Sequence, residues 1–164
     1  MPDWFVVNVR DAHWRKHDTF GASCVFEDSK TSFETCGVNI RVLQPGQPNC
    51  LYHSESNQED FLVLAGECLL LVDGEERPLR AWDFVHCPPG TEHVFVGAGD
   101  GPSVILMVGA RSEDERLLYP DSELARRHGA GAERETTSPE EAYAPFAPPP
   151  REERPDRWAE LPWA

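Results

Sequence analysis

The sequence predicts an all-β domain, a barrel or a sandwich, followed by a short appendage of helix and extended chain. Between Trp4 and Arg111 the apolar residues fall into short runs separated by turn residues, which is typical of many short strands. Beyond Arg111 this pattern stops, and eight of the fifteen prolines lie there. A chain of 164 residues is long enough for one buried core with an appendage. We therefore expect an N-terminal arm with edge strands over residues 1–36, a barrel over 37–111 and a proline-rich appendage over 112–164.

Ten segments are expected to form strands, because each combines apolar or β-branched residues with flanking turn residues. In chain order they are WFVVNV (4–9), SCVFE (23–27), GVNIRVL (37–43), CLYHSES (50–56), DFLVLAG (60–66), CLLLVDG (68–74), ERPLR (76–80), WDFVHCP (82–88), HVFVGAG (93–99) and SVILMVGA (103–110). Asp73-Gly74 is the strongest hairpin signal, since both residues tolerate the positive φ of a type I′ turn. Gly66-Glu67 predicts a second tight reversal, and Pro88-Pro89-Gly90 predicts the end of a strand.

The appendage is expected to contain two brief helices. Asp121 can cap a helix over SELARRH, which Gly129 would end. The segment Ser138-Pro139-Glu140-Glu141 has the pattern of a capping box with proline at the first helical position. The stretch APFAPPPREERPDRW (144–158) is typical of extended, polyproline-like chain. Three aromatic residues are expected to dock on the barrel or on a neighbouring subunit, namely Phe146, Trp158 and Trp163.

The charge balance and the cysteines narrow the class of protein. Fifteen basic residues against 29 acidic residues give a net charge of −14, which repels phosphate backbones and anionic lipid surfaces. We expect no nucleic acid partner and no membrane partner. The N-terminal residues lack the apolar stretch of a secretory signal. The five cysteines are odd in number and contain no CxxC pair, so a reduced, cytoplasmic protein is the simplest interpretation.

The residues most able to carry chemistry lie in the segment YHSESNQED and at the start of HVFVGAG. Side chains alternate faces along a strand, so His53 and Glu55 share one face. Glu59 opens the next strand after the short loop SNQ and can return toward the same place. His93 begins a later strand and can add a fourth donor from across the barrel.

These two segments resemble the two sequence motifs of the cupin superfamily. The first motif is matched by Gly46, His53, Glu59 and Gly66, and the second by Pro88, Gly90 and His93. The chain departs from the pattern at three positions: Glu55 stands where the family usually has its second histidine, Trp82 replaces a leading glycine, and Gly97 replaces an asparagine. The resemblance covers about residues 37–111.

The resemblance implies a cupin-type double-stranded β-helix, or jelly-roll barrel, with one divalent transition metal inside it. The implied ligands are His53, Glu59 and His93, with Glu55 as a fourth ligand or as a nearby catalytic base. Two imidazoles and two carboxylates would be neutral with a divalent ion and suit Fe, Mn, Zn, Ni or Co. If Glu55 does not bind, the two-histidine, one-carboxylate triad leaves positions open for substrate or dioxygen. Glu55 would then act as a general base.

Other residues near these segments are expected to have structural roles. Cys87 is expected to point inward, and His86 to point outward or to support a metal ligand from behind, because neighbouring strand residues alternate. His13, Trp14 and His17 are expected on a surface arm. The barrel filling or an apolar pocket wall is expected from Phe61, Val63, Phe84, Val85, Phe95, Ile105 and Met107. A pocket of that kind indicates a small organic substrate.

Three functions remain open, because a fold alone does not select a reaction. The leading hypothesis is a dioxygenase or other oxidoreductase acting on a small organic molecule at the His/Glu-ligated metal. The alternative is a non-redox isomerase, epimerase or lyase in which Glu55 moves a proton, and the third is a non-catalytic metal- or ligand-binding protein. No basic cluster lies near the motifs, which disfavours a phosphorylated ligand. In each case we expect a homodimer with contacts from the tryptophan-bearing N- and C-terminal arms.

Overall fold

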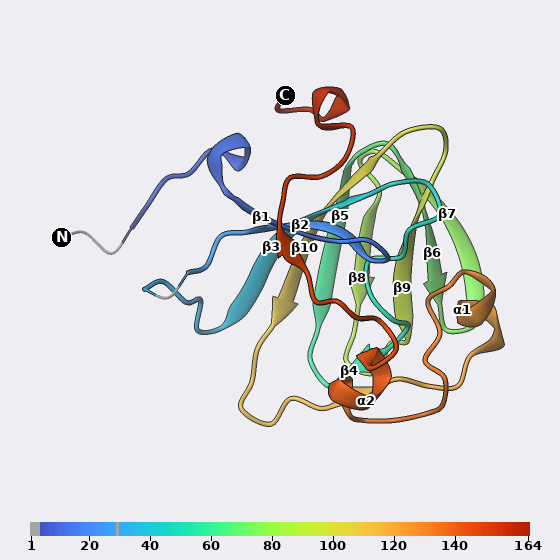
Figure 1. Cartoon of the computed structure of the whole chain (residues 1–164). Helices are drawn as coiled ribbons and strands as arrows, with labels where there is room; N and C mark the ends of the chain where they lie inside the picture. The colour runs from blue at the N-terminus through green and yellow to red at the C-terminus, as the bar shows by residue number, and fades with distance from the viewer. Residues whose placement is uncertain (1–3, 29) are drawn as a thin grey trace.

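The computed structural model describes residues 4–28 and 30–164, which form a β-barrel with the C-terminal segment laid across it (Figure 1). The strands are β1 (His13–His17), β2 (Gly21–Val25), β3 (Cys36–Leu43), β4 (Ser54–Glu55), β5 (Glu59–Ala65), β6 (Glu67–Val72), β7 (Glu75–Arg80), β8 (Phe84–Cys87), β9 (His93–Ala98), β10 (Ser103–Ala110), β11 (Leu117–Leu118) and β12 (Arg151–Glu152). The helices are α1 (Glu123–Arg127) and α2 (Pro139–Tyr143), with 3-10 turns at Val9–Asp11 and Trp158–Glu160. Within the described ranges no helix has the length and apolar character needed to cross a membrane.

Two antiparallel sheets enclose the barrel interior. The larger sheet has the strand order β12-β1-β2-β3-β10-β5-β8, and the smaller sheet has the order β7-β6-β9. A separate short pair, β4 with β11, lies near one end of the barrel. Strands of both sheets contribute to one buried cluster, which consists of Leu43, Phe61, Val63, Cys68, Leu70, Cys87, Phe95, Ile105 and Met107. The predicted all-β jelly roll is therefore confirmed.

The prediction that Phe84 fills the barrel is wrong. Its side chain is 65% exposed, because β8 alternates and gives its inner face to Val85 and Cys87. His86 points outward from the same strand and pairs with Asp60 at 2.6 Å. The predicted orientations of His86 and Cys87 are thus confirmed.

The predicted turns take the expected backbone conformations. Asp73 and Gly74 have φ of 45° and 79° between β6 and β7, as a type I′ hairpin requires. Gly66 has φ of 72° between β5 and β6. A Cβ at Gly66 would also lie 2.4 Å from the carbonyl oxygen of Pro102. This reversal therefore needs glycine both for its positive φ and for the close approach of Pro102.

The N-terminal region differs from its prediction. Residues 4–8 have no regular structure and Val9–Asp11 form a 3-10 turn, so the strand expected over 4–9 is absent. The strand begins instead at His13, and Trp14 is buried rather than exposed on an arm. β1 extends the larger sheet by pairing with β2. This pairing turns Trp14 toward a second apolar cluster, which lies outside the barrel.

The outer apolar cluster lies between the larger sheet and the C-terminal segment. Its buried members are Trp14, Ala22, Cys24, Ile40, Val42, Val104 and Leu161, with Trp158 and Trp163 packed against them. Phe146 packs separately against Phe20 and Tyr143, with ring centroids 4.9 and 6.4 Å apart. The expectation that the aromatic residues of the appendage dock on the barrel is therefore confirmed.

Both predicted helices form, with one change of cap. α1 is capped by Ser122, whose hydroxyl accepts from the Ala125 N–H at 3.2 Å, so the prediction of Asp121 as the cap is wrong by one residue. Gly129 ends this segment with φ of 68°. α2 begins at Pro139, and the Ser138 hydroxyl caps it as predicted.

Candidate metal centre

A backbone bridge places the two predicted histidine ligands opposite each other. The His53 N–H donates to the His93 carbonyl at 3.2 Å, and the His93 N–H donates to the His53 carbonyl at 2.8 Å. Side chains of such a hydrogen-bonded antiparallel pair leave the same face, and the two imidazole centroids are 5.0 Å apart. The sequence predicts a strand over residues 50–56, but only Ser54–Glu55 (β4) are regular strand. The isolated bridge nevertheless holds His53 directly opposite His93.

The carboxylates of Glu59 and Glu55 lie beside these rings. Glu59 is the first residue of β5, paired between β8 and β10, and its Oε2 is 3.0 Å from His93 Nε2. Glu55 Oε1 is 3.3 Å from His53 Nε2. One donor atom from each of His53, Glu59 and His93 lies within 4.8 Å of the others. The structure thus brings three predicted ligands together and leaves Glu55 next to that group.

The orientation of the two imidazoles fits a bound cation. His53 Nδ1 lies 2.8 Å from the Leu51 carbonyl oxygen, and His93 Nδ1 lies 3.0 Å from that of Thr91. A carbonyl oxygen only accepts, so each Nδ1 carries hydrogen and each neutral ring presents Nε2 as an electron-pair donor. Both Nε2 atoms then face carboxylate oxygens, and either a proton on Nε2 or a cation between the two groups offsets the repulsion. A divalent metal is such a cation, and backbone carbonyls commonly orient metal-binding histidines in this way.

The pKa shifts of the residues around this histidine and carboxylate group also favour a bound cation. Burial alone would lower the pKa of His53, but Cys50, Glu55 and Glu59 together raise it well above its ordinary value. Burial would raise the pKa of Glu55, but the neighbouring His53 side chain lowers it overall. Burial and the Glu55 carboxylate raise the pKa of Glu115. The site therefore concentrates acidic groups whose repulsion a cation would offset.

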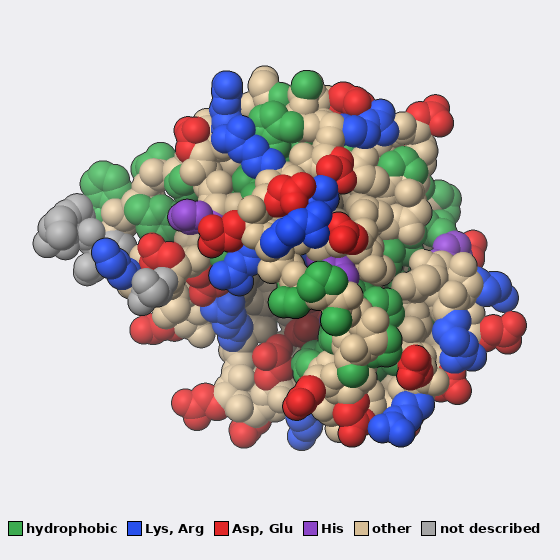
Figure 2. Space-filling model, viewed as in Figure 1, with side chains coloured by type: hydrophobic (Ala, Val, Ile, Leu, Met, Phe, Trp, Pro, Cys, Tyr) green, Lys and Arg blue, Asp and Glu red, His purple; other side chains and the backbone are tan. Residues whose placement is uncertain are grey.

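The group faces a cavity of about 310 Å³, a volume at the lower end of the range for small-molecule sites. Its other walls include Asn39, Arg41, Asn49, Met107, Glu115 and Tyr119. Figure 2 shows a hollow on the face that carries the C-terminal segment, with acidic side chains inside it and hydrophobic side chains along one edge.

Of these wall residues only Met107 was named from the sequence, and the other five were missed. Asn39 and Arg41 had a usable signal, because they are the polar residues of the strand GVNIRVL and share a face with Leu43 of the core. Glu115 and Tyr119 had none, since they lie in the irregular chain around β11 and reach the cavity only through tertiary folding.

Comparison with known proteins agrees with this architecture. Residues 39–109 match the family model described as Cupin domain. A sugar phosphate isomerase of the cupin superfamily from Silicibacter pomeroyi is 26% identical with a TM-score of 0.63, over 73% of this chain and 83% of that chain. A predicted oxalate decarboxylase from Thermotoga maritima is 19% identical with a TM-score of 0.57, over 66% of this chain and 100% of that chain.

A further structure, from Acidithiobacillus ferrooxidans, matches only in part. It is 24% identical with a TM-score of 0.49, and the match covers 51% of this chain and 55% of that chain. No curated protein sequence matches the chain.

The fold and its interior histidine and carboxylate cluster define a double-stranded β-helix protein with a candidate metal centre. The family match and the similar structures agree, and residues 39–109 form a cupin domain.

Proposed function

We propose that the protein is a metal-dependent enzyme that acts on a small organic molecule, with oxygen-dependent redox chemistry as the leading reaction class. The observation that carries this proposal is the group of His53, Glu59 and His93 donors, of which His53 and Glu59 line one cavity. These two imidazoles and one carboxylate would hold the ion, and a set of three protein ligands would leave ligand positions free for substrate. A metal held there would supply Lewis acidity and, as Fe(II), redox chemistry.

The residues around the metal ligands have separate roles in this proposal. The carbonyls of Leu51 and Thr91 fix the two imidazoles by accepting from Nδ1. Glu55 lines the same cavity, 3.3 Å from His53 Nε2. Its carboxylate can therefore complete the ligand set or take a proton from a bound substrate.

A non-redox isomerase, epimerase or lyase is the second candidate. Two observations support it: the 26% identity with the Silicibacter pomeroyi sugar phosphate isomerase, and the Glu55 carboxylate beside the ligand group. In such a reaction the substrate carbonyl is polarised while Glu55 moves a proton between neighbouring carbons.

Calorimetric titration of metal-free protein with Fe(II), Mn(II) and Zn(II) tests the metal centre. His93→Ala is expected to weaken binding by about a hundredfold or more, because it removes a ligand outright. The matched control is His86→Ala, since His86 is an exposed histidine paired with Asp60, and it should leave the affinity unchanged. Equal affinity in the His93 variant would overturn the proposal. Loss of affinity in Glu55→Ala would identify a fourth ligand, whereas retained affinity would favour the base.

The reaction class is tested with the metal-loaded protein and a panel of keto acids, hydroxy acids and sugar phosphates. Oxygen uptake by the Fe(II) form, absent from the Zn(II) form, supports the redox enzyme. Incorporation of solvent deuterium into a substrate without oxygen uptake supports the isomerase, and Glu55→Gln should then abolish it. Metal binding with neither reaction would favour the non-catalytic binding protein.

A further inference from the structure

Two polar side chains of β3, Asn39 and Arg41, line the barrel interior, and each has a buried polar atom with no hydrogen-bond partner among the described residues. Side chains alternate along a strand, so Asn39 and Arg41 share a face with Leu43 of the barrel core. Arg41 Nε and Asn39 Oδ1 are buried and make no hydrogen bond within the part of the chain that the structure describes. Both residues line the cavity of the candidate metal centre. Buried polar groups normally have partners, so this pair is available to a ligand.

Arg41 differs from the other arginine of this cavity. Arg111 is neutralised by Glu27, with Nη1 to Oε1 at 2.7 Å and Nη2 to Oε2 at 2.8 Å. Burial lowers the pKa of the Arg41 guanidinium, which reflects the cost of holding its charge away from water. A guanidinium nevertheless remains protonated. Among the described residues of this wall, Arg41 is therefore the cation available to bind an anion.

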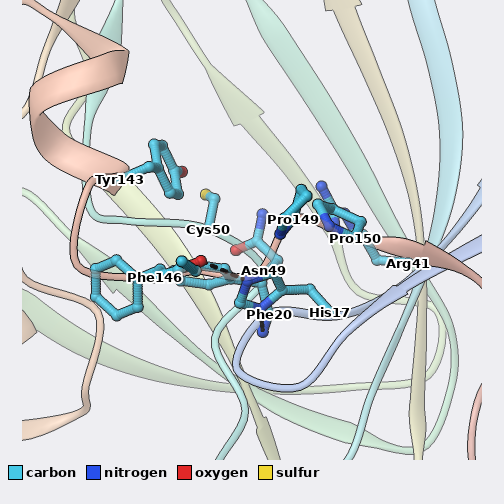
Figure 3. Close-up of a pocket in the computed structure, with 10 residues that line it drawn as sticks. His17, Phe20, Arg41, Asn49, Cys50, Tyr143, Phe146, Pro149 and Pro150 are labelled. Atoms are coloured by element: carbon cyan, nitrogen blue, oxygen red, sulfur yellow. Dashed lines mark hydrogen bonds between the residues drawn. The ribbon is translucent and has the colours of Figure 1, made fainter.

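Arg41 also lies at the junction of the metal cavity with a second cavity of about 460 Å³. The two cavities share Arg41, Asn49, Cys50 and Tyr143. The rest of the second cavity is mostly apolar and includes Phe20, Phe146, Ala147, Pro149 and Pro150. Figure 3 shows Tyr143 and Phe146 on one side of it and Arg41 beside Pro150 on the other, with Asn49 and Cys50 between them. An apolar chamber thus adjoins the metal cavity, with a positive charge at the boundary.

We propose that Arg41 binds the acid group of the substrate, and that the substrate is a small monocarboxylic acid with an apolar body. The guanidinium fork matches a carboxylate through two parallel hydrogen bonds. The apolar body lies in the chamber beside Phe146 and Pro149, and the reacting end faces His53 and Glu59, which line the metal cavity. The substrate class of the proposed enzyme would thus be a monocarboxylic acid. The position of the reacting end rests on the proposed function, because it assumes a metal at His53, Glu59 and His93.

A carboxylate suits this place better than a phosphate group. One guanidinium offsets one negative charge, whereas a phosphate monoester carries close to two at neutral pH. Glu55 and Glu59 lie on the same cavity wall and would repel the second charge.

The experiment measures binding of butyrate, benzoate and phenylacetate to metal-free and Zn(II)-loaded protein by calorimetry. Phenylacetamide is the uncharged probe of matched shape, and phenyl phosphate is the doubly charged probe. At least one acid should bind, phenylacetamide should bind more weakly than phenylacetate, and Arg41→Met should weaken acid binding by about thirtyfold or more. Arg41→Lys should retain part of the affinity. Arg77→Met is the matched control, because Arg77 is an exposed arginine on β7 paired with Glu75, and it should change nothing.

Thermal unfolding separates ligand binding from a structural role for Arg41. Methionine has similar length and no charge, so Arg41→Met should raise the Tm of the metal-free protein while it removes acid binding. A purely structural arginine would lower the Tm.

Failure of this inference is distinguishable from failure of the proposed function. Zn(II) affinity of the wild-type protein tests the metal centre alone, and acid binding to metal-free protein tests Arg41 alone. The inference is overturned if Arg41→Met keeps the acid affinity, if phenylacetamide or phenyl phosphate binds as tightly as phenylacetate, or if no acid binds.

Discussion

Trp82 adopts a backbone conformation that favours glycine. Its φ is 77° and its ring is 74% exposed, at the position where the cupin pattern has a glycine. A left-handed conformation costs an ordinary residue about 1–2 kcal/mol. Glycine avoids this cost, but it makes the unfolded chain more flexible, which cancels part of the gain in stability. Trp82→Gly should therefore raise the free energy of unfolding by roughly 0.5–1 kcal/mol in urea denaturation.

Trp82→Ala is the matched control for that prediction. Alanine removes the exposed ring but keeps the Cβ, so it should give no comparable gain. An equal gain in both variants would assign the effect to the ring rather than to the backbone.

Protons compete with the metal at His53. Metal binds the neutral imidazole, while Cys50 and the nearby carboxylates, acting against burial, hold the pKa of His53 well above its ordinary value of 6.5. Below that raised pKa, binding must displace a proton, so the affinity for Zn(II) should increase from about pH 6 to about pH 8 with proton release. Calorimetry in buffers of different ionisation enthalpy measures both quantities. His86→Ala should preserve the profile, and a flat profile would contradict the prediction.

Individual residues differed in how far the sequence predicted them. His53, Glu59 and His93 could be predicted, because strand alternation and motif spacing are local properties. Gly97 could not be explained in advance: a Cβ there would lie 2.2 Å from the Gln44 carbonyl oxygen, and that contact joins distant segments. The missing partner of Arg41 is likewise a property of the whole cavity.

At the scale of elements, β1 depends on the C-terminal segment for its burial. Trp14 is 5% exposed, and its ring lies 5.9 Å from that of Trp158 and 5.5 Å from that of Trp163. Trp14→Ala should lower the free energy of unfolding by about 3–5 kcal/mol, because it opens a large cavity in the outer cluster. Chemical denaturation measures the loss, and Trp4→Ala, at a 73% exposed tryptophan, should be nearly neutral. A small loss at Trp14 would mean that the segment is not held by this cluster.

The dependence of β1 on the C-terminal segment also explains why the sequence did not predict β1, although it predicted the barrel strands. Its sequence HWRKH is mostly charged, and Lys16 is buried only because Glu153 and Asp156 lie 3.0 and 2.6 Å from its Nζ. Those acids are more than 130 positions away along the chain. Strands such as β6 and β10 are apolar by themselves, so their own composition was sufficient.

At the scale of the whole molecule, the antiparallel jelly roll follows from local signals that agree. Each hairpin has its turn residues, as at Asp73-Gly74, and each inner face has its apolar set. The sequence predicted that the aromatic residues of the appendage dock on the barrel or on a neighbouring subunit, and it left that choice open. The structure places Trp158 and Trp163 on the chain's own barrel, so the C-terminal arm has packing of its own and removing it should destabilise the fold.

We propose that the chain forms a homodimer through its remaining apolar surface. β8 is the last strand of the larger sheet, and Phe84 is exposed on it, as are Phe5 and Val6 of the N-terminal arm. Unpaired apolar edges and exposed apolar patches are typical of contact surfaces. Light scattering should therefore give about twice the chain mass of 18.4 kDa.

Two variants locate the contact surface of that dimer. Phe84→Lys places a charge on the β8 edge and should shift the protein to a folded monomer, because the side chain is already exposed in one chain. Its Tm should fall only by the contribution of the lost association. Glu76→Lys on β7, also exposed, is the control for added charge and should leave the dimer intact. A monomeric wild-type protein would overturn the proposal, and a Phe84 variant that remains dimeric would move the contact away from β8.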